Sequence, residues 1–221
     1  MKDPYYASRY TWNKDRPVVW KEIVRFLDPF LKDSATVLDL GAGYCDFINN
    51  VHSHNRIAVD MSPDFQEFAE KSVRTIRTEV SNLKEISDGS VDTVFASNLL
   101  EHLPDEILKQ TMTEVRRVLK DGGQFIAMQP NYRYSYKTYF DDPTHVKAFS
   151  HNALQSFLVS EGFDIVLLKP KFLPFSLKSR PSIIPVQPWL IRMYLNSPIK
   201  PFAGQMLVVA KKKYKELGMN E

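Results

Sequence analysis

The sequence predicts an α/β fold in which βαβ units build a parallel sheet. Short runs rich in β-branched and other apolar residues alternate along the chain with segments of helical periodicity. The chain has 221 residues, of which 43% are apolar, which is enough for one sizeable core and little for two. We therefore expect residues 1–221 to form a single domain.

Seven segments have the composition of strands, and turn-forming residues separate several of them from the next element. The fourth, "VDTVFAS", is almost continuously apolar, as a strand buried on both faces would be. The predicted strands cover residues 36–40, 56–60, 77–80, 91–97, 124–130, 164–168 and 205–212.

Helices are predicted between these strands. One begins near Tyr44, and the others cover 62–74, 104–120 and 151–163. The segment 104–120 is the strongest, because a proline opens it, apolar residues recur at helical spacing, and "DGG" ends it. Residues 1–30, which include Trp12 and Trp20, are predicted to add a helical element before the sheet.

A proline-rich insertion over residues 170–203 precedes the last strand. A connection of this length is usually functional. Its mixture of Lys and Arg with Trp, Phe, Leu and Ile suits a lid or substrate wall, a dimer contact or a peripheral membrane contact, in that order of preference.

Charge and composition narrow the classes of partner and the compartment. The net charge is +3, and apart from "KKKYK" there is no basic block, so we expect no nucleic-acid partner. No apolar run approaches the roughly 20 residues of a membrane-spanning helix. Cys45 is the single cysteine, and the first residues lack a signal-peptide pattern, which predicts a cytoplasmic protein.

A glycine turn directly after the first strand is the main functional signal. In "VLDLGAGYCDF", Gly41 and Gly43 permit a sharp turn and the close approach of a ligand. A dinucleotide-binding turn would carry a third glycine where Asp46 stands, and a carboxylate there opposes a pyrophosphate. S-adenosylmethionine has no phosphate and carries a cationic sulfonium, so it suits this turn better than NAD. Asp60, 19 positions after Gly41, can accept hydrogen bonds from ribose hydroxyls.

The segments "VLDLGAGYCDF", "IAVDMSPD", "SDGSVDTVFASNLLEHL" and "LKDGGQFIAMQPN" resemble, in order and spacing, class I S-adenosylmethionine-dependent methyltransferases. The resemblance covers residues 34–131 and, more loosely, 143–168. It implies a Rossmann-like, seven-stranded, mostly parallel sheet with helices on both faces and a reversed final hairpin. The family usually has a third glycine where this chain has Cys45.

The resemblance also implies a set of cofactor-binding residues. The turn residues would line the methionine end of the cofactor, Asp60 the ribose, the residues after strands two and three the adenine, and those after strand four the sulfonium. In this sequence these are Asp39, Gly41, Ala42, Gly43, Asp46, Asp60, Met61, Val80, Ser81, Ser97, Asn98 and Leu99.

His145, in the polar and aromatic loop after the fifth strand, is the candidate general base, with Asp142 or Asp141 orienting it. The alternative is that His145 only braces the loop before the next helix. His102 is expected to pack and hydrogen-bond locally. The spacing of Asp141, Asp142 and His145 is not a recognised ligand set, so no metal site is predicted.

These features predict an enzyme that transfers a methyl group from S-adenosylmethionine to a small-molecule or glycan-type acceptor, on oxygen. Much of the catalysis would be positioning, because the sulfonium is already a good leaving group. Two alternatives stay open: a non-catalytic methyltransferase-like binding module, and an NAD-dependent oxidoreductase. Both a monomer and a homodimer fit the sequence.

Overall fold

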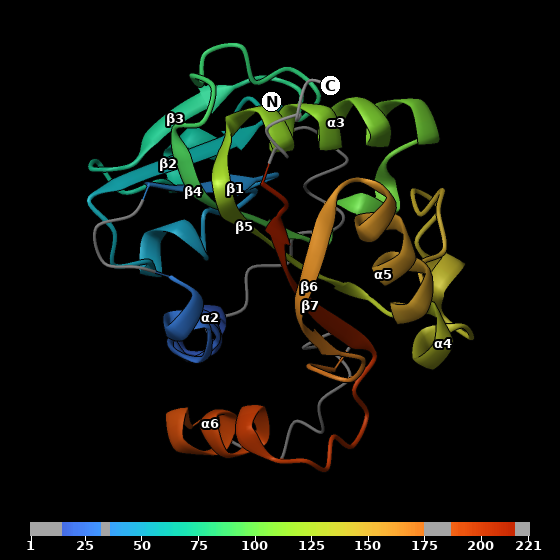
Figure 1. Ribbon diagram of the computed structural model, residues 1–221. Coiled ribbons are helices and arrows are strands. Elements are labelled where there is room, and N and C mark those ends of the chain that lie inside the picture. Colours follow the sequence, from blue (N-terminus) through green and yellow to red (C-terminus); the bar gives the residue numbers. More distant parts are fainter. Residues whose placement is uncertain (1–14, 32–35, 175–186, 215–221) are drawn as a thin grey trace.

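The computed structural model describes residues 15–31, 36–174 and 187–214, and its centre is one seven-stranded sheet (Figure 1). The strand order is β3-β2-β1-β4-β5-β7-β6, with β7 antiparallel to both neighbours and every other pair parallel. This confirms the predicted Rossmann-like sheet with a reversed final hairpin. The strands are β1 Thr36–Leu40, β2 Asn55–Asp60, β3 Arg74–Arg77, β4 Val91–Ser97, β5 Leu119–Pro130, β6 Phe163–Lys169 and β7 Gln205–Lys212.

Helices cover both faces of the sheet. The described helices are α2 Arg16–Leu27, α3 Asp105–Val118, α4 Tyr132–Ser135, α5 His151–Ser160 and α6 Pro188–Asn196. Successive strand residues point to opposite faces. Leu38 belongs to the core shared with α3 and α5, and Val37 to the core shared with α2 and α6. Within the described residues, no helix has the length and apolar character needed to cross a membrane.

The predicted N-terminal helical element is confirmed as α2, which packs against α6 from the far end of the chain (Figure 1). The Glu22 carboxylate accepts two hydrogen bonds, each 3.0 Å long, from the Arg192 guanidinium. This contact lowers the pKa of Glu22 although the side chain is buried. Trp12 and residues 175–186 of the insertion lie outside the described residues, whereas α6 is a helix that the proline-rich pattern did not predict.

The helix predicted to begin near Tyr44 is wrong. The connection from β1 to β2 covers only residues 41–54 and contains one short 3₁₀ helix, Ile48–Asn50. Gly43 (φ 50°) and Cys45 (φ 56°) both adopt the left-handed conformation, which interrupts a right-handed helix where it would begin. The cavity described below therefore has no α-helix N-terminus at this turn.

The helix predicted over 62–74 and the strand predicted over 77–80 are also wrong. A 3₁₀ helix covers Phe65–Phe68, and β3 begins at Arg74, three residues earlier than expected. Only residues 61–73 join β2 to β3, which leaves no room for a three-turn helix and its two loops. Ile76 provides the buried side chain of this edge strand, so residues 78–81 follow the strand instead of forming it.

Candidate active site

A cavity of about 760 Å³ lies at the carboxyl ends of β1, β2 and β4. Ligands of open α/β folds bind at this edge of the sheet, and the volume lies within the range of about 300–1,000 Å³ typical of ligand pockets. One wall is the glycine turn with the loops after β2 and β4. His102 belongs to the loop after β4, Asp142 and Thr144 come from the segment between β5 and α5, and α2 contributes Arg16 and Trp20.

The glycine turn, residues 41–43, is hydrogen-bonded to β2 and packs against Leu99 of the loop after β4. The N–H groups of Gly41 and Ala42 both donate to the Val59 carbonyl, at 2.8 and 3.0 Å. Gly41 has φ 72°, and a Cβ added there would lie 3.0 Å from a methyl carbon of Leu99. Glycine is therefore required by both the backbone conformation and the packing, and it leaves bare backbone on the cavity wall.

Cys45 stands where the family that the sequence resembles usually has a third glycine. It adopts a left-handed backbone (φ 56°), and its side chain is fully buried in the α2 face of the core. Burial raises the pKa of the Cys45 thiol well above its usual value, so the thiol stays protonated and unreactive.

Asp60 ties the end of β2 to the glycine turn. One carboxylate oxygen accepts from the Gly43 N–H at 2.9 Å, and the other accepts from the Ser62 N–H at 2.8 Å. The side chain is buried yet forms part of the cavity wall. A carboxylate oxygen has two lone pairs, so each can accept more than one hydrogen bond.

Two further carboxylates, Asp39 and Asp46, lie at the turn. Burial raises the pKa of Asp39 well above its ordinary value, nearby Asp60 and Asp46 add to this, and a hydrogen bond from the Ile48 backbone opposes it. Asp46 pairs with Arg16 through both Nε (3.0 Å) and a terminal nitrogen. Burial still raises the pKa of Asp46, because the loss of hydration outweighs the ion pair.

The loop after β4 is held by β5 and β7. Asn98 has φ 49°, a conformation that asparagine tolerates better than most residues. Its N–H donates to the Met128 carbonyl at 2.8 Å, and its side-chain oxygen accepts from Gln205 at 2.9 Å. These bonds position Ser97 and Leu99, which line the cavity.

Most residues predicted for the cofactor lie together around this one cavity. Those that line it are Asp39, Gly41, Ala42, Gly43, Asp46, Asp60, Met61, Val80, Ser97, Asn98 and Leu99. Ser81 is not among the lining residues, and Glu79 is, because β3 ends earlier than predicted. Arg16 and Trp20 also line the cavity without having been predicted, since only the fold brings α2 to the turn.

Of the two residues predicted for catalysis, Asp142 lines the cavity and His145 lies behind the wall, 7% exposed. His102 lines the cavity instead, with its ring centre 4.8 Å from that of His145. Thr144 connects the groups: its hydroxyl donates to Asp142 at 2.7 Å and lies 3.0 Å from Nδ1 of His102.

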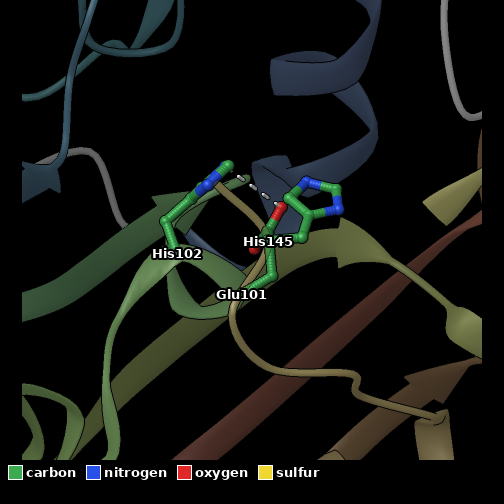
Figure 2. Close-up of side chains that lie close together, drawn as sticks. All are labelled: Glu101, His102 and His145. Atoms are coloured by element: carbon green, nitrogen blue, oxygen red, sulfur yellow. Dashed lines mark ion pairs between the residues drawn. The ribbon is translucent and has the colours of Figure 1, made fainter. Parts of the chain in front are cut away.

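Glu101, directly before His102, completes this group and was not predicted. Its carbonyl accepts the N–H groups of Val146 and Lys147, at 3.0 and 3.1 Å, which brings His145 alongside. Figure 2 shows the side chains of Glu101, His102 and His145 pointing toward one another. The adjacent acid and histidine in "LLEHL" were a local signal, but their partner is more than 40 residues away in the sequence.

Comparison with known proteins agrees with this arrangement. Residues 37–123 match a family model described as a methyltransferase domain. None of the curated proteins compared with the chain matches it.

Solved structures of similar fold cover most of the chain. An S-adenosylmethionine-dependent methyltransferase from Archaeoglobus fulgidus is 25% identical, with 95% of this chain and 100% of that chain covered and a TM-score of 0.70. A possible histamine N-methyltransferase from Thermotoga maritima is 18% identical, with 95% and 97% covered and a TM-score of 0.69. Geranyl diphosphate C-methyltransferase from Streptomyces coelicolor A3(2), solved with Mg²⁺, geranyl diphosphate and S-adenosyl-L-homocysteine, is 15% identical, with 86% and 78% covered and a TM-score of 0.61. The last two share the fold.

The glycine turn offers the open backbone that S-adenosylmethionine needs. The sheet is mostly parallel with a reversed final hairpin, as the resemblance to class I methyltransferases implies. The family match includes the turn, Asp60 and the loop after β4. These findings favour a methyltransferase over an oxidoreductase that uses NAD. Residues 37–123 therefore form a methyltransferase domain, and the chain has the fold of S-adenosylmethionine-dependent methyltransferases.

Proposed function

We propose that this methyltransferase transfers the methyl group to a hydroxyl oxygen of a small-molecule or glycan-type acceptor. The observation that carries the proposal is that one cavity joins the glycine turn to a wall of hydrogen-bonding side chains, His102, Asp142 and Thr144. A bounded cavity of about 760 Å³ suits a compact acceptor beside the cofactor better than a polymer lying across a basic surface.

The cofactor would occupy the side of the cavity formed by the turn. Asp60 would accept from the ribose hydroxyls, Met61 and Val80 would flank the adenine, and Ser97, Asn98 and Leu99 would lie beneath the sulfonium. Arg16 forms an ion pair with Asp46 and compensates its charge. Asp39, Gly41, Ala42 and Gly43 would then hold the methionine end of the cofactor.

The reaction would be an in-line displacement. The acceptor oxygen forms a bond to the methyl carbon, the bond from carbon to sulfur breaks, and its electron pair stays on sulfur as S-adenosylhomocysteine forms. The acceptor's proton must leave, and we assign its removal to the cavity wall that contains Asp142. His145 lies behind this wall and would act through His102, whose ring it contacts. His145→Ala should therefore reduce turnover and leave cofactor affinity unchanged.

The role of the insertion stays a prediction. None of the described residues of α6 lines the cavity, and Arg192 of α6 bonds to Glu22 of α2, the helix that contributes Arg16 and Trp20 to the cavity. Trp189 and Met193 are 60% and 59% exposed, which keeps a lid, a dimer contact and a peripheral membrane contact as candidate roles.

The test is a methyl-transfer assay with isotopically labelled S-adenosylmethionine. Acceptors would include sugars, phenols, amines and an RNA oligonucleotide, with the methylated atom identified by mass spectrometry and NMR. We expect label on an oxygen of a hydroxylated small molecule or sugar. Label confined to amines, to a carbon atom or to RNA would contradict the proposed acceptor and leave the methyltransferase assignment intact.

A further inference from the structure

A buried carboxylate faces two imidazoles at the edge of the cavity. Glu101 is fully buried, and neither of its carboxylate oxygens has a hydrogen-bond partner among the described residues. One ligand atom from each of Glu101, His102 and His145 lies within 4.8 Å of the others (Figure 2). Burying an ionised carboxylate without compensation is costly, so this position calls for a proton or a cation.

Hydrogen bonds fix which nitrogen of each ring carries the proton. Nδ1 of His145 lies 2.5 Å from the Tyr139 carbonyl oxygen, which can only accept. Nδ1 of His102 lies 3.2 Å from the Thr144 carbonyl and 3.0 Å from the Thr144 hydroxyl, whose own hydrogen is donated to Asp142. Both neighbours of that nitrogen therefore accept, and Nδ1 is the donor in both rings.

With the proton on Nδ1, Nε2 is the basic nitrogen of each neutral imidazole, and Nε2 of His145 lies 3.9 Å from an Asp142 oxygen. Nε2 of His102 lies 3.9 Å from a Glu101 oxygen. Metal-binding histidines show this pattern, in which one nitrogen donates to a carbonyl or carboxylate and the other binds the ion. Segment 144–147, held to the Glu101 backbone, fixes the second ring in place.

We propose that Glu101, His102 and His145 form a binding site for a divalent first-row transition metal ion such as Zn²⁺. Two imidazoles and a carboxylate are ligands that such ions accept, and a three-residue set leaves a coordination position open. In a tetrahedral site the ligand atoms lie about 3.3 Å apart, given bonds of about 2.0 Å, so binding draws the group together by up to about 1.5 Å. The His102 side chain is 21% exposed and lines the cavity, so it is the ligand that can shift when the ion binds, and the ion would enter from the cavity past it.

The open position would face the cavity. This step rests on the proposed function, whereas metal binding itself does not. An acceptor hydroxyl bound to the ion would have a lowered pKa and release its proton to the Asp142 carboxylate on the cavity wall. The resulting alkoxide oxygen would then bond to the methyl carbon as the bond from carbon to sulfur breaks, with its electron pair left on sulfur.

The test is direct metal binding to the full chain after treatment with a chelator. Co²⁺ titration followed by visible absorption reports the ligand field, and Zn²⁺ calorimetry reports stoichiometry and affinity. We expect one ion per chain, with affinity reduced at least tenfold in Glu101→Gln and in His145→Ala. His151→Ala is the matched control, because His151 is similarly buried but does not belong to the cluster, and it should bind like the wild type.

If Glu101→Gln does not fold, as judged by circular dichroism, His102→Ala on the cavity wall replaces it. Absence of saturable binding to the wild type, or equal affinity in the cluster variants and His151→Ala, would overturn the metal site. A metal-loaded enzyme that methylates no faster than the chelated one would overturn the coupling to the acceptor. S-adenosylhomocysteine binding, measured in parallel, separates these results from a failure of the cofactor site.

Discussion

Replacing Asp60 with alanine should damage both the fold around the cavity and the affinity for the cofactor. The carboxylate accepts the Gly43 N–H at 2.9 Å and the Ser62 N–H at 2.8 Å. Alanine removes both acceptors and leaves these two N–H groups facing the cavity. The same substitution removes the oxygens that we assign to the ribose hydroxyls.

The size of each effect follows from the bonds that are lost. A hydrogen bond to a charged group contributes about 1.5–3 kcal/mol, so two of them set an upper value of about 6 kcal/mol. Water entering from the cavity can replace part of this, and we expect the free energy of unfolding to fall by about 2–4 kcal/mol. Loss of the ribose contacts, about 2–3 kcal/mol, would weaken binding by about 30- to 150-fold.

Urea unfolding and calorimetric titration with S-adenosylhomocysteine measure the two effects separately. Asp92→Asn is the matched control. Asp92 also accepts a backbone N–H, from Thr36 at 2.9 Å, but it lies near the start of β4 and does not line the cavity. This control should lose about 1 kcal/mol of stability and keep its cofactor affinity. A folded Asp60→Ala protein that binds with wild-type affinity would refute the ribose assignment.

Three further predictions concern the turn and the residues around it. Gly41→Ala should lower the free energy of unfolding by about 1–2 kcal/mol because of the left-handed backbone, and by more because the added Cβ would lie 3.0 Å from Leu99; it should also weaken S-adenosylhomocysteine binding. Gly89→Ala is the control, because Gly89 is also left-handed but an added Cβ would have nothing within 4 Å, so only the backbone effect is expected. Equal losses of stability in the two variants would contradict the packing role of Gly41. The pKa of Asp39 in the folded chain is raised above its ordinary 3.8, so the folded chain binds more protons than the unfolded chain, and stability falls as pH rises above about 4. The stability of Asp39→Asn relative to wild type, measured by urea unfolding, should therefore increase between pH 5 and 8. A difference that stays constant over this range would count against a buried acid at this position. Arg16→Met should lower stability at pH 8 by about 1–3 kcal/mol, and adding Asp46→Asn should restore most of it; additive losses in this double-mutant cycle would show that the ion pair contributes nothing.

The elements predicted well from sequence are those with a complete local signal. The fourth strand and the last strand have the predicted bounds, because each is an apolar run set apart from its neighbours in sequence. Helix α3 was predicted to within two residues at each end, since Pro104 opens it and its apolar face is regular. The helices near Tyr44 and over 62–74 failed because periodicity does not report how few residues the sheet leaves between adjacent strands.

The part of the site that sequence motifs mark, the glycine turn and Asp60, was predicted correctly as lying together. The glycines and Asp60 meet at one cavity because parallel strands bring their carboxyl ends to one edge. The inference from the charge of Asp46 was incomplete, because Arg16, 30 residues away, pairs with it, and no local pattern marks that contact. Glu101 was overlooked for the same reason, since its interest comes from burial and from His145, which only the folded loop brings near.

Calorimetric titration of the wild-type chain with S-adenosylmethionine, S-adenosylhomocysteine and NAD tests the central claim most directly. The two adenosyl ligands should each bind at one site per chain and compete with each other, and NAD should not bind. Binding of NAD, or no binding of either adenosyl ligand by a folded chain, would contradict the assignment of this cavity to S-adenosylmethionine.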